Sequence, residues 1–247
     1  MFLARTTSSL YDAALALVYP QPCAVCGAHV EARSDGVACA VCWQETRVFN
    51  GAETICWKCG AEARGVVGEE ERAAVRCRRC DGEAFTAARA CGLYEGALRA
   101  CVLALKREAH VPLRLARLML EAQQRAPLSL ATCIVPVPLH TERLRERGFN
   151  QAEVLASALS RESRLPPVEE SLIRTVHTER HRAGMDARAR RESVHEAFAV
   201  ERPRLVEGER ILLVDDVFTT GATVSSCATA LKAAGAREVF VLTVARP

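Results

Sequence analysis

The stretch Ile211-Leu-Leu-Val-Asp-Asp-Val-Phe-Thr-Thr-Gly-Ala-Thr223 decides how the rest of the sequence is interpreted. Its four leading apolar residues, 211–214, predict a short strand that is buried on both faces, as in a parallel sheet. Two carboxylates and a turn of small residues follow. Apolar residues then recur at helical spacing until Gly235, which favours a helix end. The predicted order is strand, acidic pair, turn and helix.

The turn has the composition of a phosphate-binding loop. Small residues let backbone N–H groups converge on one point, and the N-terminus of the next helix adds partial positive charge. Gly221 permits a positive φ. Hydroxyl donors come from Thr219, Thr220 and Thr223. Carboxylates at the strand end can accept hydrogen bonds from sugar hydroxyls. A phosphorylated sugar could therefore bind both to the turn and to the two carboxylates. The alternative is an ordinary strand-to-helix turn with a threonine N-cap.

Residues 211–223 resemble the 5-phosphoribosyl-1-pyrophosphate (PRPP) loop of type I phosphoribosyltransferases. The resemblance rests on two acids followed by Thr-Thr-Gly-x-Thr, which is a far more specific pattern than a glycine-rich run. It implies an α/β fold with a mostly parallel sheet and flanking helices. The implied contacts to the 5-phosphate come from Thr219, Thr220, Gly221, Ala222 and Thr223. The implied catalytic pair, which holds the ribose hydroxyls, is Asp215 and Asp216.

Length and composition set the outer bounds. The chain has 247 residues, room for one large domain or two smaller ones, and its apolar fraction of 49% predicts a globular core. A net charge of +3 is too small to indicate nucleic-acid binding by itself. No apolar run is long enough to span a membrane, so a cytoplasmic location is expected. The first 22 residues favour a capped amphipathic helix over a signal peptide, because Asp12 interrupts the apolar run.

Eight of the twelve cysteines form four C-x-x-C pairs: Cys23/Cys26, Cys39/Cys42, Cys56/Cys59 and Cys77/Cys80. Intervals of 12, 13 and 17 residues between successive pairs predict two structural zinc sites, each with four thiolate ligands, in a small zinc-ribbon domain. A disulfide framework is the alternative, but it would need an oxidising compartment. Sequential pairing, with the first four thiols on one ion, is favoured over a cross-brace arrangement. The four remaining cysteines are predicted to be buried: Cys91, Cys101, Cys133 and Cys227.

Two tryptophans, Trp43 and Trp57, flank the zinc knuckles, with Lys58 nearby. One interpretation is that both tryptophans form the small core of a zinc domain, and this one is favoured. The alternative is that they stack on single-stranded nucleic acid. The composition shifts near Asp81, so a boundary is predicted between residues 1–84 and residues 85–247. A fragment from Ala84 onward is accordingly expected to fold and bind PRPP, and to lose any binding of single-stranded DNA.

The second segment contains predicted strands at residues 90–94, 134–138 and 239–244. Prolines end the middle strand in a rigid turn, and arginines follow it. Arginine forks match phosphate oxygens, so this turn is a candidate pyrophosphate site; a charged loop without a ligand is the alternative. The candidate residues are Pro138, Leu139, His140 and Arg147, with Lys106 from a predicted helix. Residues 171–198 are rich in arginine and histidine, which indicates either a cationic flap or a solvated amphipathic helix.

Taken whole, the sequence resembles the ComF family. The marks are the four C-x-x-C pairs, Tyr94-Glu-Gly96, Leu105-Lys106, Val135-Pro-Val-Pro-Leu-His140, Arg147-Gly-Phe-Asn-Gln151, Ala197-Phe198 and the PRPP loop. The family implies a double zinc ribbon, a phosphoribosyltransferase body and a link to natural competence. Three positions depart from the family pattern: His177, Arg182 and Ser193. If they hold substrate in the family, catalysis by this chain is in doubt, whereas PRPP binding is not.

The resemblance implies a reaction in which pyrophosphate leaves C1 of the ribose and an acceptor replaces it. Positive charge develops on the ribose, as in glycoside cleavage, and Mg²⁺ neutralises the leaving group. No acceptor motif is legible, so two functions stay open. One is phosphoribosyl transfer to an unidentified acceptor. The other is a non-catalytic PRPP-sensing adaptor, or one associated with single-stranded DNA or with a DNA-uptake helicase or processing protein.

Overall fold

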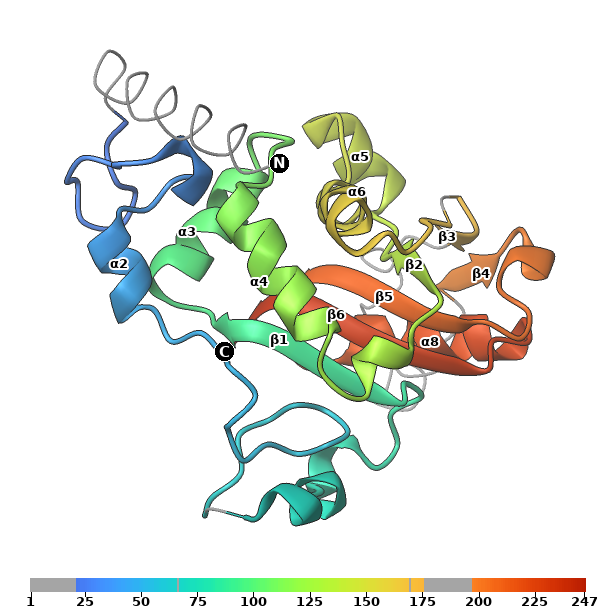
Figure 1. Ribbon diagram of the computed structural model, residues 1–247. Helices are drawn as coiled ribbons and strands as arrows, with labels where there is room; N and C mark the ends of the chain where they lie inside the picture. The colour runs from blue at the N-terminus through green and yellow to red at the C-terminus, as the bar shows by residue number, and fades with distance from the viewer. Residues whose placement is uncertain (1–20, 66, 169, 176–196) are drawn as a thin grey trace, which may run out of the picture.

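The computed structural model describes residues 21–65, 67–168, 170–175 and 197–247 (Figure 1). The predicted N-terminal helix and most of the predicted cationic flap, with His177, Arg182 and Ser193, lie outside these residues. At the centre is a parallel sheet with strand order β1-β6-β5-β2. Its strands are β1 (Ala87–Leu93), β2 (Cys133–Pro136), β5 (Arg210–Val217) and β6 (Glu238–Arg246). The predicted parallel sheet is confirmed.

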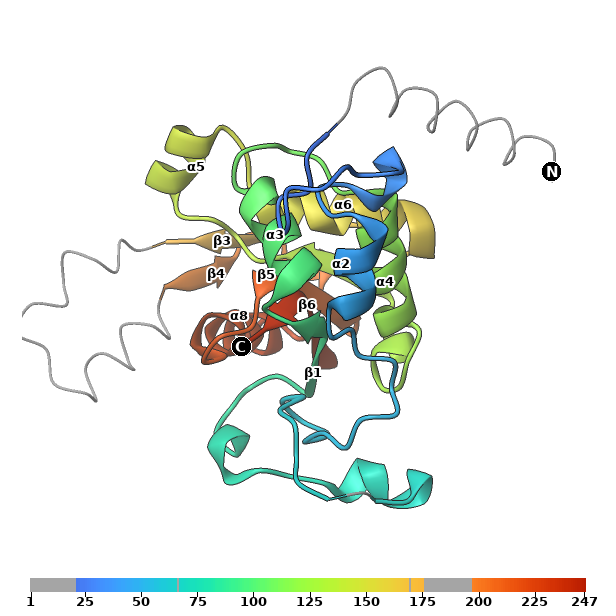
Figure 2. The ribbon, with the colours of Figure 1, turned by 90° about the vertical axis from the view of Figure 1, so that its left-hand side faces the viewer.

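Strand β5 shows why a run of apolar residues forms the middle of this sheet. Alternate side chains of a strand point to opposite faces. Leu212 and Val214 belong to the buried cluster under helices α3 (Gly96–Leu105), α4 (Leu113–Gln123) and α6 (Gln151–Ser163). Ile211 and Leu213 belong to the cluster under helix α8 (Ala222–Ala233). Figures 1 and 2 show the resulting layers, with helices on both faces of the sheet.

Shorter elements surround these layers. Beyond the carboxyl end of β2 lies the short helix α5 (Thr141–Arg147), where the sequence allowed a charged loop. Strands β3 (Leu172–Arg174) and β4 (Phe198–Val200) form a separate antiparallel pair. The remaining elements are α2 (Ala40–Glu45) and the 3₁₀ turns η1 (Arg33–Asp35), η2 (Glu69–Ala74), η3 (Arg78–Cys80), η4 (Leu128–Leu130) and η5 (Pro203–Leu205).

The cysteine-rich segment shares its buried residues with the rest of the chain. Its first half, with Cys23, Cys42 and Trp43, belongs to the same cluster as Leu98 of α3. Its second half, with Cys56, Cys59 and Cys80, belongs to the cluster on the other face of the sheet, together with Phe85. Each half therefore completes the hydrophobic core on a different side of the sheet. The boundary between residues 84 and 85 remains a proposed division.

Backbone hydrogen bonds also join the cysteine-rich segment to the edge strand β1. The Phe49 N–H donates to the Cys91 carbonyl over 2.8 Å, and the Leu93 N–H donates to the Arg47 carbonyl over 3.0 Å. Further along β1, the Ala88 N–H donates to the Lys58 carbonyl over 2.6 Å. The segment from Arg47 to Lys58 thus covers an edge that would otherwise expose unpaired backbone groups.

Trp43 lies in the core, as the favoured interpretation predicted. It is only 3% exposed, and its Nε1 donates to the Asp35 carbonyl over 2.9 Å. The Arg114 guanidinium lies 4.7 Å from the centre of its ring. A side chain enclosed in this way has no free face for a nucleobase, so stacking of Trp43 on nucleic acid was a wrong alternative. The four unpaired cysteines are buried, as predicted.

None of the helices in the described part of the chain is long and apolar enough to cross a membrane.

Candidate functional site

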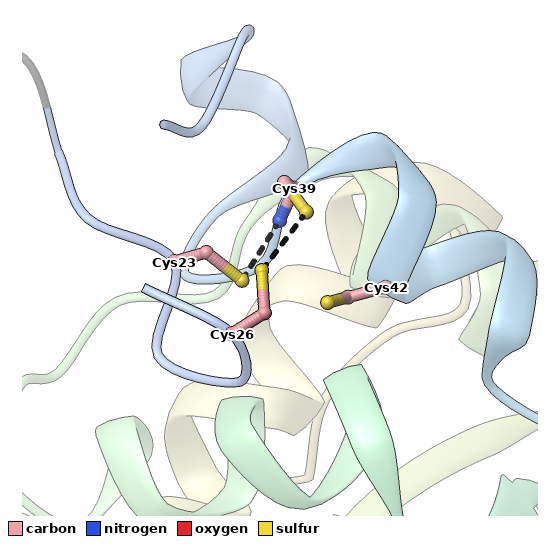
Figure 3. Close-up of side chains that lie close together, drawn as sticks. All are labelled: Cys23, Cys26, Cys39 and Cys42. Atoms are coloured by element: carbon pink, nitrogen blue, oxygen red, sulfur yellow. Dashed lines mark hydrogen bonds between the residues drawn. The ribbon is translucent and has the colours of Figure 1, made fainter. Parts of the chain in front are cut away.

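The eight paired cysteines form two separate clusters in the sequential arrangement. One contains Cys23, Cys26, Cys39 and Cys42, and the other contains Cys56, Cys59, Cys77 and Cys80; the sulfur atoms of each cluster lie within 4.8 Å of one another. Figure 3 shows the first cluster, whose thiols come from a turn and from the start of α2 and point toward a common centre. Sequential pairing is confirmed, and the cross-brace alternative is excluded by this geometry.

The sulfur spacing fits zinc. Tetrahedral Zn–S bonds of about 2.3 Å put neighbouring sulfurs about 3.8 Å apart. Cys26 Sγ and Cys39 Sγ lie 3.7 Å apart, and the corresponding distance between Cys56 and Cys80 is 3.6 Å. These separations are too long for a disulfide bond of about 2.05 Å. The two clusters are therefore consistent with two structural zinc sites.

Backbone N–H groups donate to a cysteine sulfur in each cluster and stabilise its thiolate form. The N–H groups of Val25 and Cys39 donate to Cys23 Sγ over 3.4 and 3.3 Å (Figure 3 draws the second). Burial raises the pKa of Cys23, but these donors and its neighbours outweigh that effect and lower the pKa to about 6. Cys56 receives the same kind of bond from the Cys77 N–H over 3.3 Å. Thiolates are the form that binds zinc, so the knuckle backbone favours metal binding.

A second candidate site lies where the parallel strands end. A cavity of about 560 Å³ opens beyond their carboxyl ends, the usual ligand position in sheets of this type. Its wall contains eight of the residues predicted from the sequence: Lys106, Pro138, Leu139, Arg147, Asp215, Asp216, Thr219 and Thr223. These residues come from the end of α3, from the turn after β2, from α5, from the end of β5, from the turn that follows it and from the start of α8. Only the tertiary structure brings them together.

Four predicted residues do not line this cavity. Gly221 precedes α8 with φ +85°, which is the positive φ that a glycine at this position permits. Thr220 is exposed and Ala222 begins α8. The His140 side chain caps α5, where its Nδ1 accepts from the Glu142 N–H over 3.1 Å. This cap uses Nδ1, and the contact of His140 with pyrophosphate stays a prediction.

Sequence reasoning assigned no ligand role to four other polar residues of the cavity wall: Tyr94, Asn150, Gln151 and Arg174. Asn150 is 3% exposed; its amide donates to the Val137 carbonyl over 3.0 Å and caps α6 through the Ala152 N–H. Gln151 is also 3% exposed, yet its buried Nε2 has no hydrogen-bond partner among the described residues. Asn150 and Gln151 belong to the motif Arg147-Gly-Phe-Asn-Gln151, which the sequence analysis had noted as a family mark. Only the fold shows that these two residues line a cavity.

Charged side chains of both signs line the cavity. Lys106, Arg143, Arg147 and Arg174 supply positive charge, and Asp215 and Asp216 supply negative charge. Burial raises the pKa of Asp215 to about 7, and the nearby charge of Asp216 contributes to the rise. A hydrogen bond from the Asp216 N–H to Asp215 Oδ1, 2.9 Å long, opposes it. Asp215 is therefore a carboxyl group that changes charge near neutral pH.

Replacement of Asp215 by Asn should stabilise the ligand-free protein more at high pH than at low pH. The folded-state pKa of about 7 lies above the ordinary value of 3.8, so folding favours the protonated form and wild-type stability falls as the pH rises from about 4 to about 7. The amide removes this penalty. We expect the stability gain of Asp215→Asn to be about 1 kcal/mol larger at pH 8 than at pH 5.5, allowing for partial solvation.

Urea denaturation of both proteins at the two pH values measures this difference. The exposed Glu162 on α6 offers a control, and Glu162→Gln should show no comparable pH dependence. An Asp215→Asn gain that is the same at both pH values would show that Asp215 does not change its charge between pH 5.5 and pH 8.

Comparison with known proteins finds matches for both segments of the chain. Residues 14–81 match the model of the double zinc ribbon domain, and residues 145–247 match that of the phosphoribosyl transferase domain. DNA utilization protein YhgH of Escherichia coli K12 is 32% identical over 216 residues, which cover 84% of this chain and 89% of that protein. The chain belongs to the ComF family. The resemblance found in the sequence is thereby confirmed.

Two further ComF relatives match over shorter segments. Competence protein F of Haemophilus influenzae is 37% identical over 128 residues, 51% of this chain and 55% of that protein. Competence protein ComFC of Bacillus subtilis is 38% identical over 98 residues, 40% of this chain and 37% of that protein. Among solved structures, the glutamine PRPP amidotransferase of Bacillus subtilis is similar over 60% of this chain and 26% of that one, with 21% identity and a TM-score of 0.36.

Proposed function

We propose that the chain binds PRPP together with Mg²⁺ in the cavity at the carboxyl ends of the strands, and transfers the phosphoribosyl group to an acceptor in a process that serves DNA uptake or use. The observation that carries the proposal is the convergence on this cavity of the Thr-rich loop, the acidic pair and a group of cationic side chains. The names of the ComF relatives support the link to DNA use.

The loop before α8 suits the 5-phosphate. The turn from Thr219 to Thr223 places Gly221 in the left-handed region directly before a helix of 12 residues, whose first N–H groups have no partners within the helix. These N–H groups and the hydroxyls of Thr219 and Thr223 are the donors that a phosphate would use. A larger residue at 221 would be strained, since an added Cβ would lie 2.9 Å from the Phe218 ring.

The acidic pair suits the ribose, and the cationic side chains suit the pyrophosphate. Asp215 and Asp216 would accept hydrogen bonds from the ribose hydroxyls and favour the positive charge that develops on the ring. Lys106 and Arg147, with the backbone of residues 138–140, would hold the leaving pyrophosphate. The unpartnered amide of Gln151 offers a further donor to a polar ligand.

The donor set is compatible with Mg²⁺. Magnesium prefers oxygen ligands and keeps several waters or substrate oxygens. The bound substrate and water would supply most of these oxygens, and the carboxylates of Asp215 and Asp216 lie on the same cavity wall. When bound, Mg²⁺ would neutralise charge on the pyrophosphate.

Asp215→Asn and Asp216→Asn should each weaken PRPP binding. Each change removes a charged acceptor for a ribose hydroxyl, worth about 1.5–3 kcal/mol, so affinity should fall roughly 10- to 100-fold. Calorimetry with PRPP and Mg²⁺ at pH 8, where Asp215 is ionised, measures the change. Glu162→Gln again serves as the control. Unchanged affinity in both aspartate variants would remove the ribose-binding role.

The enzyme and the adaptor differ in whether pyrophosphate is released. Incubation of the full chain with PRPP, Mg²⁺ and a pool of purine and pyrimidine bases tests this. Release that depends on one acceptor supports transfer. Tight PRPP binding with no release across the pool favours the non-catalytic PRPP-sensing adaptor.

A further inference from the structure

A second cavity, remote from the PRPP loop, lies between the second cysteine cluster and the sheet. It has a volume of about 430 Å³. One wall comes from the cysteine-rich segment, including Trp57 and η2, and the other from β1 and the end of α4. Figures 1 and 2 show this half of the cysteine-rich segment against the edge strand β1. None of the residues assigned to PRPP or to zinc lines it.

Three arginines give this cavity its charge. Arg72, Arg89 and Arg125 line it, and in the described ranges none of them has a carboxylate oxygen within 4.0 Å. The two acids of the wall are Glu53 and Glu69, so positive charge is in excess. Glu53 is already used, because its two oxygens accept from the Asn50 and Gly51 N–H groups, each over 2.9 Å.

Two of these guanidinium groups are held in place yet incompletely satisfied. Arg89 Nη1 donates to the carbonyls of Trp57 and Ala88, both over 2.8 Å, and Arg72 Nη1 donates to the Gly51 carbonyl over 2.9 Å. By contrast, Arg89 Nη2 and Arg72 Nε are buried and have no acceptor within the described residues. A buried donor without an acceptor costs about 1–3 kcal/mol, so both groups favour an occupant that brings acceptor oxygens.

The rest of the wall is apolar and includes an aromatic ring. Phe49, Ile55 and Ala122 line the cavity alongside Trp57. The Arg89 guanidinium lies over the Trp57 ring, 4.9 Å from its centre, so a positive charge lies directly against the aromatic surface. Such a wall suits a ligand that has a planar ring next to an anionic group.

We propose that this cavity binds a small aromatic anion of nucleoside monophosphate size, with its ring against Trp57 and its phosphate toward Arg72 and Arg125. The volume lies within the range of about 300–1,000 Å³ that is usual for small-molecule sites. A mononucleotide also supplies both chemistries that the wall presents. The site does not depend on PRPP binding at the other cavity.

Calorimetric titration of the full, zinc-loaded chain with AMP tests the proposal. Arg72→Gln and Arg125→Gln should each weaken AMP binding about 10-fold, because each removes one charge-assisted hydrogen bond. Arg89 is left unchanged, since it also lies near Cys56 and Cys59. Arg78→Gln is the matched control, because Arg78 is an exposed arginine of the same segment outside the cavity. Its AMP affinity should equal that of wild type.

A further variant separates this site from the proposed 5-phosphate loop, which could also take the phosphate of AMP. Thr223→Val should weaken PRPP binding and leave AMP binding at the second cavity unchanged. AMP binding that is lost in Thr223→Val but kept in both arginine variants would overturn the proposal. So would the absence of AMP binding at millimolar concentration. Inorganic phosphate and adenosine should each bind more weakly than AMP, and phosphate binding as tightly as AMP would refute the role of Trp57.

Zinc content and thermal denaturation of every variant show whether it folds. If an arginine variant loses zinc, the corresponding lysine variant is titrated in its place. Arginine-to-lysine replacement keeps the charge but not the fork, so AMP affinity should fall between wild type and the glutamine variant. Suppose that both glutamine variants misfold and both lysine variants bind AMP as tightly as wild type. That result would count against directed hydrogen bonds from Arg72 and Arg125 to AMP.

Discussion

Freshly purified protein should contain two zinc ions per chain, and their removal should unfold the cysteine-rich segment. Structural zinc sites contribute about 10–16 kcal/mol of apparent binding free energy at pH 7, comparable to or larger than the stability of a typical domain. Because each cluster belongs to the core on one face of the sheet, loss of metal should also lower the melting temperature of the whole chain. Elemental analysis and thermal denaturation with and without a chelator measure both effects.

A single-ligand variant makes this test specific. Cys26 is the exposed thiol of the first cluster, so Cys26→Ser removes a ligand without removing core packing. We expect that variant to keep about one zinc per chain, at the second cluster. Cys133→Ala is the control, since Cys133 is buried but belongs to neither cluster, and it should keep two ions. Less than about one zinc per chain in the wild type would contradict the assignment.

The fragment from Ala84 to Pro247 should fail to fold as a stable monomer, although the sequence suggested that it would be independent. Removal of residues 1–83 deletes Trp43 and Val30 from the cluster that contains Leu98. Each large apolar side chain contributes about 1.5–3 kcal/mol on burial, so the loss is a substantial part of a typical stability of about 5–15 kcal/mol. The deletion also exposes the backbone edge of β1 that residues 47–58 cover.

Size-exclusion chromatography and denaturant unfolding of the fragment test this expectation, with the full chain as control. Aggregation or a non-cooperative transition is the expected result. A monodisperse fragment that unfolds cooperatively and binds PRPP as well as the full chain would show that the two segments fold independently. Binding of single-stranded DNA by such a fragment would then place the relevant surface beyond residue 84.

The local chemistry of this protein was readable from its sequence alone. The run at residues 211–214 predicted a doubly buried strand, because its side chains are apolar on both faces, and all four are buried. The positive φ of Gly221 could be expected, because glycine adopts this backbone conformation in tight turns and other residues rarely do. The spacing of the cysteines indicated zinc because a C-x-x-C turn aims two thiolates at one ion.

Features that depend on which segments become neighbours required the folded chain. Near-equal intervals between the cysteine pairs left their pairing open, and the tertiary structure resolved it. Whether Trp43 faced solvent or the core depended on α3 and Arg114, which lie far away in the sequence. The same holds for the cavity that joins Gln151 to the acidic pair, and for the arginine-lined cavity beside Trp57. Local patterns report on bonded neighbours, whereas burial and cavity walls arise from contacts between residues that are distant along the chain.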